Sequence, residues 1–233
     1  MVHPITQFYE GRLGLVVLRL VRARVAQIWP EGRGLSMLGL GHAGPYLAPF
    51  AGVARTVVAG PLLPAPERYP AVGLGLACVS EEDSLPFADL SFDRVLLVHG
   101  LEAAENAGRL LREAWRVLKD DGRLIVVVPN RRGWWAYVDD TPFGQGQPYS
   151  PGQIGRLLQA SLFRVERRDT ALFVPPTRLG VVLRGAAAWE AVGRAVAPQF
   201  AGVTITEATK DLYGAVPAGA MRARRRLVFT EAR

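Results

Sequence analysis

Three glycines that follow an apolar stretch are the first residues whose type and spacing point to chemistry. Gly39, Gly41 and Gly44 form a G-x-G-x-x-G pattern within residues 34–47. Because glycine lacks a Cβ atom, such a turn after a strand lets the backbone approach a bound nucleotide closely. The pattern alone is weak evidence, since any tight strand-to-helix turn can use glycine. His42 lies inside the turn and is a candidate contact for a cofactor.

Acidic and imidazole side chains form a second group further along the chain. Glu81, Glu82 and Asp83 precede a Leu-Pro-Phe turn, and His99 directly follows an apolar run, with Glu102 nearby. An imidazole in this place is a candidate general base for an acceptor that must lose a proton. A histidine that ends a strand is more often a hydrogen-bonded structural residue, so the sequence leaves both interpretations open.

Other kinds of catalytic site find little support in the sequence. No set of His, Cys and carboxylate residues has metal-ligand spacing, so no bound metal ion is expected. Neither a Gly-x-Ser-x-Gly nor a Gly-x-x-x-x-Gly-Lys motif is present. The single cysteine, Cys78, excludes an internal disulfide framework and favours a reducing, cytoplasmic location.

The residues around these groups have the hydrophobic patterns of a strand, a helix and a second strand. Residues 95–98 and 123–129 are apolar runs, and a β-branched run of this kind suits a strand buried on both faces. Between them, apolar residues recur at the three- and four-residue spacing of a helix: Leu110, Leu111, Ala114, Val117 and Leu118. This order predicts a parallel crossover unit. Ligands of such sheets bind beyond the carboxyl ends of the strands.

Taken with these elements, the motifs resemble those of class I S-adenosylmethionine-dependent methyltransferases of the type 11-like kind. The resemblance is carried by Asp-Ser-Leu-Pro-Phe at 83–87, Ser-Phe-Asp-Arg-Val at 91–95 and the run 112–124, and it covers roughly residues 34–130. It implies an α/β fold, a Rossmann-like doubly wound, mostly parallel seven-stranded methyltransferase sheet with an N-terminal helix and a C-terminal insertion. Residues 141–150 further resemble an uncharacterised alphaproteobacterial subgroup of methyltransferase-like proteins.

The same resemblance implies where S-adenosylmethionine would bind. Its methionine and ribose end is expected against the glycine turn, and its adenine end at the acidic residues before Leu85. Which of those carboxylates makes the contact cannot be told from the sequence. The residues expected to contact the cofactor are Gly39, Gly41, His42, Gly44, Glu81, Glu82, Asp83, Leu85 and His99, and His99 is also the candidate catalytic base.

Two acidic residues of the family's pattern are missing from this chain. Residues 36–38 lack the acid that usually precedes the first glycine, and residues 56–61 lack the carboxylate that would bind the ribose hydroxyls. Each lost contact is expected to weaken cofactor binding by about 1 to 3 kcal/mol.

The sequence therefore supports two functions from different classes. The first is an S-adenosylmethionine-dependent methyltransferase that acts on an unidentified acceptor. The second is a noncatalytic methyltransferase-like protein, a pseudoenzyme, that acts through a protein partner. A Rossmann oxidoreductase is disfavoured by the missing ribose carboxylate and by the Leu-Pro-Phe pattern.

The chain is basic, which raises the question of anionic partners. Its net charge is +7, and Arg222, Arg224, Arg225 and Arg226 form the densest cluster. Basic patches bind phosphates without reading sequence, but no nucleic-acid-binding module is recognisable, so nucleic acid is not the favoured partner. No apolar run reaches the ~18–20 residues that span a bilayer, so no transmembrane segment is expected.

The whole chain, residues 1–233, is expected to form one methyltransferase-like domain. Its expected parts are an N-terminal helix at 8–30, a cofactor-binding core at 34–130, a loop or lid at 131–152 and a helical insertion at 176–202. The N-terminal helix has an apolar face and several arginines. It is expected to pack on the sheet, with binding to an anionic membrane as the alternative.

Two further segments carry expectations. The aromatic residues of the lid either wall a substrate pocket or pack the loop down: Trp134, Trp135, Tyr137, Phe143 and Tyr149. Residues 203–208 and 225–230 are expected to form an antiparallel hairpin that closes the sheet.

Overall fold

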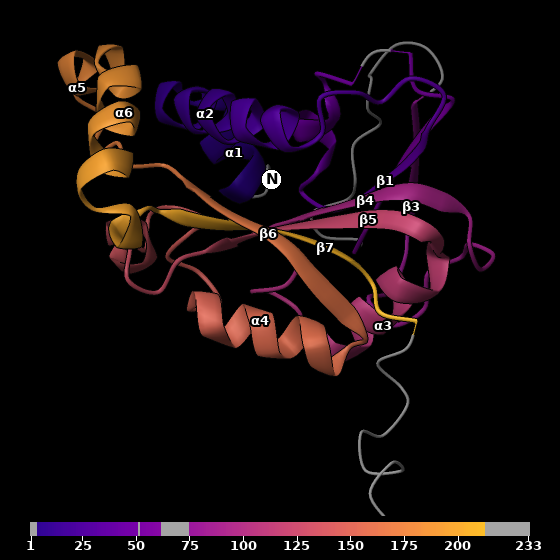
Figure 1. The fold of residues 1–233 in the computed structure, drawn as a ribbon. Coiled ribbons are helices and arrows are strands. Elements are labelled where there is room, and N and C mark those ends of the chain that lie inside the picture. The colour runs from indigo at the N-terminus through magenta and orange to yellow at the C-terminus, as the bar shows by residue number, and fades with distance from the viewer. Residues whose placement is uncertain (1–3, 51, 62–74, 213–233) are drawn as a thin grey trace, which may run out of the picture.

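A seven-stranded sheet organises the part of the chain that the structure describes. The structure is a computed structural model, and it describes residues 4–50, 52–61 and 75–212 (Figure 1). The strands are β1 (Ser36–Gly41), β2 (Arg55–Gly60), β3 (Gly75–Val79), β4 (Phe92–Val98), β5 (Leu118–Pro129), β6 (Phe163–Ala171) and β7 (Val203–Lys210). Their order across the sheet is β3-β2-β1-β4-β5-β7-β6.

The strand directions confirm the doubly wound fold expected from the sequence. Strands β1 to β5 are parallel, and β7 lies antiparallel between β5 and β6. The strand order reverses between β1 and β4, whose last residues Gly41 and Val98 are paired. In open sheets of this kind, ligands bind at the carboxyl ends of strands beside such a switch point.

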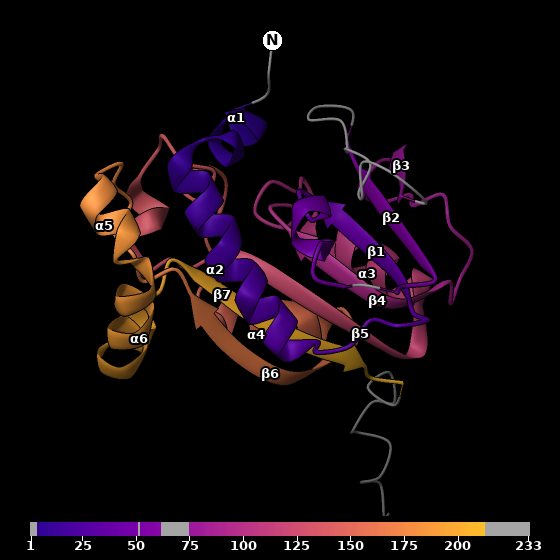
Figure 2. The same cartoon turned by 90° about the horizontal axis from the view of Figure 1, so that it is seen from above.

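Helices cover both faces of the sheet (Figures 1 and 2). One face carries α1 (Pro4–Glu10), α2 (Arg12–Ile28), α5 (Gly180–Arg184) and α6 (Ala186–Val196). The other carries α3 (Ala107–Val117) and α4 (Pro151–Ala160). Three short 3₁₀ helices complete the elements: η1 (Gly44–Leu47), η2 (Trp134–Tyr137) and η3 (Pro198–Phe200).

Two hydrophobic cores lie on the two faces, because successive side chains of a strand point to opposite sides. In β4, Leu96 and Val98 belong to the core under α2, whereas Val95 and Leu97 belong to the core over α3 and α4. All four side chains are buried. A continuous apolar run is therefore what a strand covered on both faces requires.

The N-terminal segment packs on the sheet, which was the favoured expectation. Helix α2 buries Leu13, Val17, Val21 and Val25 along one face. A Cβ atom on Gly14 would lie 2.1 Å from the carbonyl oxygen of Phe8, so this glycine allows α1 to fold back closely on α2. None of the helices in the described part of the chain is long and apolar enough to cross a membrane.

The expected pairing of the last strands is wrong. Strand β7 pairs with β5 on one side and with β6 on the other, and β6 takes the place that residues 225–230 were expected to fill. Residues 225–230 and the arginine cluster of Arg222 to Arg226 lie outside the described residues. The pairing between β6 and β7 spans a connection of about 30 residues that contains α5 and α6, and strand periodicity alone does not reveal such a long-range partner.

Candidate functional site

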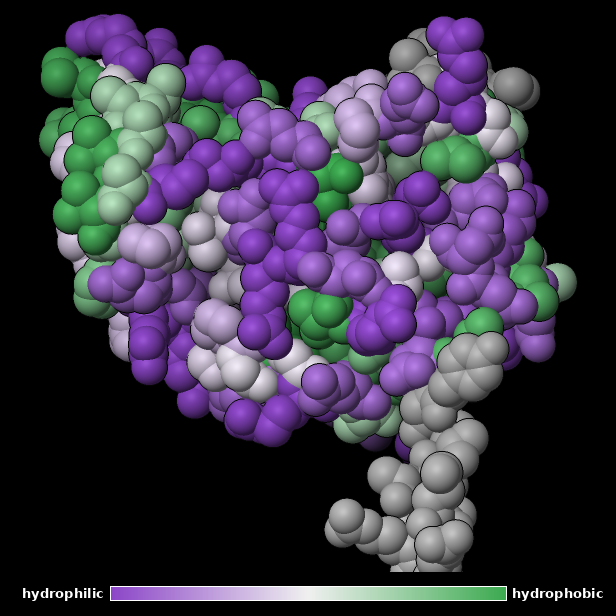
Figure 3. Space-filling view, viewed as in Figure 1, coloured by the Kyte–Doolittle hydropathy of each residue, from purple (hydrophilic) through white to green (hydrophobic). Residues whose placement is uncertain are grey.

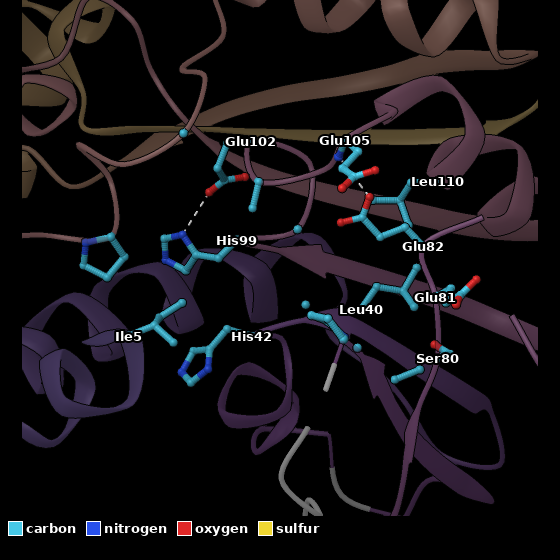
Figure 4. Close-up of a pocket in the computed structure, with 18 of the residues that line it drawn as sticks. Ile5, Leu40, His42, Ser80, Glu81, Glu82, His99, Glu102, Glu105 and Leu110 are labelled. Atoms are coloured by element: carbon cyan, nitrogen blue, oxygen red, sulfur yellow. Dashed lines mark hydrogen bonds and ion pairs between the residues drawn. The ribbon is translucent and has the colours of Figure 1, made fainter. Parts of the chain in front are cut away.

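A cavity of about 390 Å³ lies where the carboxyl ends of β1 to β4 meet (Figure 4). Its wall is formed by the ends of these four strands and the turns that follow them, by Leu110 of α3 and Ile5 of α1, and by three residues after β5: Pro142, Gln145 and Gly146. This is the edge of the sheet at which the sequence places the glycine turn, the acidic residues and His99. The cavity is therefore the candidate binding site.

The glycine turn contributes one of its three glycines to the cavity wall. Gly41 lines the cavity with His42, whereas Gly39 and Gly44 lie outside the wall. Gly41 has a φ angle of +67°, and a Cβ atom there would lie 2.4 Å from the carbonyl oxygen of Val98. The His42 amide donates to that same oxygen at 2.8 Å. Because Gly41 has no Cβ atom, the ends of β1 and β4 can come close enough for this hydrogen bond to form. A substitution of Gly41 would therefore strain the sheet as well as the site.

Two of the three acidic candidates reach the cavity. Glu81 and Glu82 line it, but Asp83 lies outside the wall, where its Oδ2 accepts from Arg109 Nη1 at 3.1 Å. Glu82 Oε2 accepts from the backbone amide of Glu105 at 3.1 Å. Burial raises the pKa of the Glu82 carboxyl above its ordinary value. Glu82 is thus the best enclosed of the three.

The described part of the wall after β2 carries no carboxylate at residues 59–61. Ala59, Gly60 and Pro61 line the cavity there, and none of the three has a side chain that can accept a hydrogen bond. The carboxylates on the cavity wall are instead Glu81, Glu82, Glu102 and Glu105.

Both ring nitrogens of His99 are engaged in hydrogen bonds. Nδ1 lies 2.9 Å from Oε1 of Glu102, and Nε2 lies 2.7 Å from the hydroxyl oxygen of Tyr9 (Figure 4 shows the first contact). The side chains of His99 and Glu102 are only 4% and 3% exposed. If Nδ1–H donates to the carboxylate, Nε2 accepts from the Tyr9 hydroxyl. His99 also has a φ angle of +52°, in the left-handed region that few non-glycine residues adopt.

The hydrogen-bonded chain continues into the core. The hydroxyl oxygens of Tyr9 and Tyr46 lie 2.6 Å apart, and the Tyr9 ring stacks on His42 at a centroid distance of 4.6 Å. Burial raises the pKa of both tyrosines, so both hydroxyls stay protonated and can donate. Glu102, His99, Tyr9 and Tyr46 therefore form one relay that runs from the cavity into α1 and η1.

Glu102 presents an acceptor that the protein leaves unused. Its Oε2 atom is buried and has no hydrogen-bond partner among the described residues. In Figure 4 this second oxygen points away from His99. A buried carboxylate oxygen without a donor is costly, so a ligand that supplies an N–H or a cation would be bound favourably here.

The segment after β5 closes over Glu102. Gly146 has a φ angle of +78°, and a Cβ atom on it would lie 2.4 Å from the carbonyl oxygen of Glu102. The Gln147 amide donates to that oxygen at 3.0 Å. Gly146 lines the cavity with Pro142 and Gln145. The expected lid thus supplies part of the wall, through small and polar residues.

The aromatic residues of this segment do not line the cavity themselves. Trp135 and Phe143 are buried and pack the segment down, and the Phe143 ring lies 4.7 Å from that of His99. Trp134 and Tyr137 are exposed. The sequence left open whether these aromatic residues wall a substrate pocket or pack the loop down. Trp135 and Phe143 pack the loop down.

The Arg-Glu pattern in α3 holds the turn beside the cavity in place. Glu113 Oε2 accepts from the Leu85 amide at 2.9 Å, and Arg116 donates to the carbonyl oxygens of Leu85 and Phe87 at 2.9 and 2.7 Å. The two side chains also bind each other at 2.7 Å. This part of the motif therefore positions Leu85, which lines the cavity.

Sequence reasoning missed the partners of His99. Glu102 was noted only as a neighbour, although its position three residues after His99 was a usable signal. Tyr9 lies 90 residues before His99 and follows no motif, so nothing in the sequence pointed to it. Among the described residues, no group of three or more His, Cys, Asp or Glu side chains is placed to hold a metal ion.

A family comparison matches the region that surrounds the cavity. Residues 45–126 match the family model described as "Methyltransferase domain". This range begins just after the glycine turn and includes the acidic candidates and His99.

Curated relatives match a similar part of the chain. An uncharacterized protein of Methanocaldococcus jannaschii is 34% identical over 102 residues, 44% of this chain and 47% of that protein. A demethylmenaquinone methyltransferase of Lactobacillus johnsonii is 30% identical over 108 residues, 42% of this chain and 40% of that protein. The chain thus spans less than half the length of the curated relatives it matches.

Solved structures share the fold at low sequence identity. A methyltransferase from Thermotoga maritima, described as a possible histamine N-methyltransferase, has a TM-score of 0.59 at 20% identity, covering 90% of this chain and 100% of that one. A chain in the complex of the Haloferax volcanii Trm112 methyltransferase activator with a methyltransferase has a TM-score of 0.56 at 18% identity, covering 81% and 88%. The protein therefore has the fold of these solved methyltransferases, which confirms the fold expected from the resemblance.

Proposed function

We propose that this protein is an S-adenosylmethionine-dependent methyltransferase whose cofactor binds in the cavity at the carboxyl edge of the sheet. The observation that carries the proposal is the unpartnered Oε2 atom of Glu102, a residue of the cavity wall. The amino acid half of S-adenosylmethionine ends in an ammonium group, which is the kind of donor that this oxygen requires.

The cavity suits such a ligand in size and in the distribution of its polar groups. Small-molecule sites have volumes of about 300 to 1,000 Å³, mostly apolar walls and a few placed polar groups. Gly41 and His42 would hold the methionine end beside Glu102, and Glu82 would accept from the adenine end. When bound, the cofactor supplies a methyl group activated on a sulfonium, so that positioning an acceptor in line provides much of the rate acceleration.

His99 is the candidate base for an acceptor that must lose a proton. Its Nε2 atom is bonded to the Tyr9 hydroxyl, so Nε2 would take a proton from the acceptor once that hydroxyl has moved away. Glu102 would then stabilise the imidazolium through Nδ1. An acceptor that already carries a lone pair needs no such base.

The noncatalytic alternative is less well supported. It draws on the absent ribose carboxylate and on the pairing of a structurally similar chain with the Trm112 activator in Haloferax volcanii. An open cavity with an unused buried carboxylate oxygen favours retained cofactor binding. A protein partner is compatible with either function.

Other expectations stay predictions. These are the single-domain organisation of residues 1–233, the cytoplasmic location, the resemblance to the alphaproteobacterial subgroup and the identity of the acceptor. The cofactor contacts assigned to Gly39, Gly44 and Asp83 stay predictions as well, and their places outside the cavity wall make them the weakest of the set.

Isothermal titration calorimetry with S-adenosylmethionine and S-adenosylhomocysteine tests the proposal directly. We expect both ligands to bind in the micromolar range and NAD to bind far more weakly. If neither sulfur compound binds at millimolar concentration, the cavity is not a cofactor site and the noncatalytic alternative takes its place.

A further inference from the structure

Helix α6 differs from a usual surface helix, because it buries a charged residue and exposes apolar ones. Its two charged residues are Glu190 and Arg194. Glu190 is buried, where its Oε1 accepts from the Phe173 amide at 2.6 Å, and Arg194 Nη2 lies 3.5 Å from its Oε2. The face turned to solvent instead carries Trp189, Val192 and Val196.

The exposed apolar surface extends beyond α6 to its neighbours. We call it the α5–α6 patch; its side chains are 41% to 76% exposed and are Leu179, Val181, Trp189, Val192, Val196 and Phe200. Figure 3 shows hydrophobic side chains gathered over α5 and α6. A patch of this kind on a soluble surface marks an interaction site, because isolated exposed apolar residues are common but grouped ones are not.

The exposed charge within the segment that carries the patch is positive. From residue 175 to residue 202 the charged residues are Arg178, Arg184, Glu190 and Arg194, and the single acid among them is the buried Glu190. Asp140, from the segment after η2, is the acidic residue that lines a hollow together with Arg178. The patch therefore offers a surface that is apolar at its centre and basic at its border.

Exposed aromatic residues stand beside the patch. Trp134 and Tyr137 of η2 are 60% and 75% exposed. Gly133 directly precedes η2, and a Cβ atom on it would lie 2.3 Å from the carbonyl oxygen of Ala201, so η2 and the end of η3 are neighbours. Tryptophan and tyrosine favour the boundary between lipid headgroups and acyl chains, because each ring combines an apolar body with a polar tip.

We propose that the α5–α6 patch docks on an anionic lipid surface. Apolar residues on one helix face, arginines at the border and adjacent Trp and Tyr side chains are the features of an interfacial helix. A symmetric contact with a second copy would bring Arg184 of both copies together, and the segment 175–202 offers no exposed acid to pair with it. A lipid surface instead supplies phosphates for Arg178 and Arg184 and an apolar layer for Trp189, Val192 and Val196.

The position of the patch links it to the cavity. Residues 172–202 connect β6 to β7 at the edge of the sheet where β5 ends, which is also the edge that carries the cavity. Docking would hold this edge at the membrane and favour an acceptor that partitions into lipid. That last consequence rests on the proposed methyl transfer, whereas the docking itself does not.

Sedimentation of the full chain with lipid vesicles, without cofactor, tests the docking. We expect binding to phosphatidylcholine vesicles that contain phosphatidylglycerol and much weaker binding to phosphatidylcholine alone, with a loss at high salt. The double variant Val192→Glu with Val196→Glu should weaken binding by about tenfold or more, since it places two carboxylates against the membrane. Arg184→Gln should weaken it by about fivefold.

Leu76→Glu is the matched control. Leu76 is also exposed, at 50%, but it lies on β3 at the opposite end of the sheet, so its substitution should leave vesicle binding unchanged. All of these positions face solvent, and circular dichroism should therefore report an unchanged fold in each variant.

Quenching of tryptophan fluorescence by brominated lipids shows which part of the protein contacts the lipid. We expect quenching that falls markedly in Trp189→Phe. Absence of vesicle binding overturns the proposal, as does binding that the Val192 and Val196 substitutions leave intact. If the protein does not bind vesicles but forms a concentration-dependent dimer that these substitutions abolish, a second copy covers the patch instead.

Discussion

The two ends of the cavity are built in different ways. The end beside β1 and β4 contains Glu102 and His99, which are buried and belong to a hydrogen-bonded relay that reaches Tyr9. The end beside β2 and β3 has an apolar wall at residues 59–61 and carboxylates that are partly or fully exposed. In the proposed binding mode, Glu102 would hold the amino acid end of the cofactor, and the described wall at residues 59–61 would offer no carboxylate to its ribose. We infer that most of the binding free energy comes from the Glu102 end.

The largest effect on cofactor binding is expected from Glu102→Gln, which alters the end of the cavity beside β1 and β4. Hydrogen bonds to a charged group contribute about 1.5 to 3 kcal/mol, so we expect affinity for S-adenosylhomocysteine to fall by about tenfold to a hundredfold. Calorimetry measures the change. Asp121→Asn is the control, because Asp121 is an exposed carboxylate of β5 outside the cavity wall and its loss should leave affinity unchanged. Equal effects of the two substitutions would show that Glu102 has no special role.

Pro61→Asp tests the end of the cavity beside β2 and β3, where we infer that the cofactor is bound less strongly. Pro61 directly follows β2 and lines the cavity, and it belongs to the segment 56–61 in which the family's carboxylate is missing. An acid there gains hydrogen bonds to ribose hydroxyls, and we expect affinity for S-adenosylmethionine to rise by up to about tenfold. The same titration measures it. Unchanged affinity would mean that the ribose does not lie against β2.

The third prediction concerns how Glu113 stabilises the fold at the turn after β3. The hydrogen bond from Arg116 holds the pKa of Glu113 below its ordinary value, and Glu113 in turn holds Leu85. Since the unfolded state then binds more protons, the stabilisation is present above the unfolded pKa and is lost as pH falls through the folded pKa. We expect Glu113→Gln to cost about 1 to 2 kcal/mol at neutral pH and little in acid. Urea unfolding at both pH values measures this, and a cost that does not depend on pH would contradict it.

Tyr9→Phe tests the relay with the smallest expected effect. The change removes the hydroxyl that joins His99 Nε2 to Tyr46 and preserves the ring that stacks on His42. We expect a loss of about 1 to 2 kcal/mol in the free energy of unfolding, with cofactor affinity changed far less than by Glu102→Gln. A loss of affinity as large as that of Glu102→Gln would place Tyr9 in direct contact with the ligand.

The fold could be predicted from the sequence where local patterns decide it. The apolar runs of β4 and β5 and the spacing of apolar residues in α3 are local, and the structure confirms all three elements. The pairing of β6 with β7 could not be predicted in the same way, since its register depends on packing across the inserted α5 and α6. Nor could periodicity show which face of α6 points inward, because Glu190 occupies a position where an apolar residue is expected.

The site was predictable in outline but not in detail. The resemblance and the sheet topology placed Gly41, Glu82 and His99 at one edge, and the structure brings all three to the cavity. Gly39 and Gly44 share the spacing of Gly41, but the turn directs only one of the three to the wall. Tyr9 reaches His99 because α1 folds back on α2, a tertiary contact that no short motif encodes.

A crystal structure of the protein with S-adenosylhomocysteine tests the central claim most directly. Our account predicts the ligand in the cavity at the carboxyl ends of β1 to β4, with its ammonium group on Glu102 Oε2 and its adenine end towards Glu82. A ligand bound elsewhere, or bound in the cavity with Glu102 Oε2 still unpaired, would contradict the account.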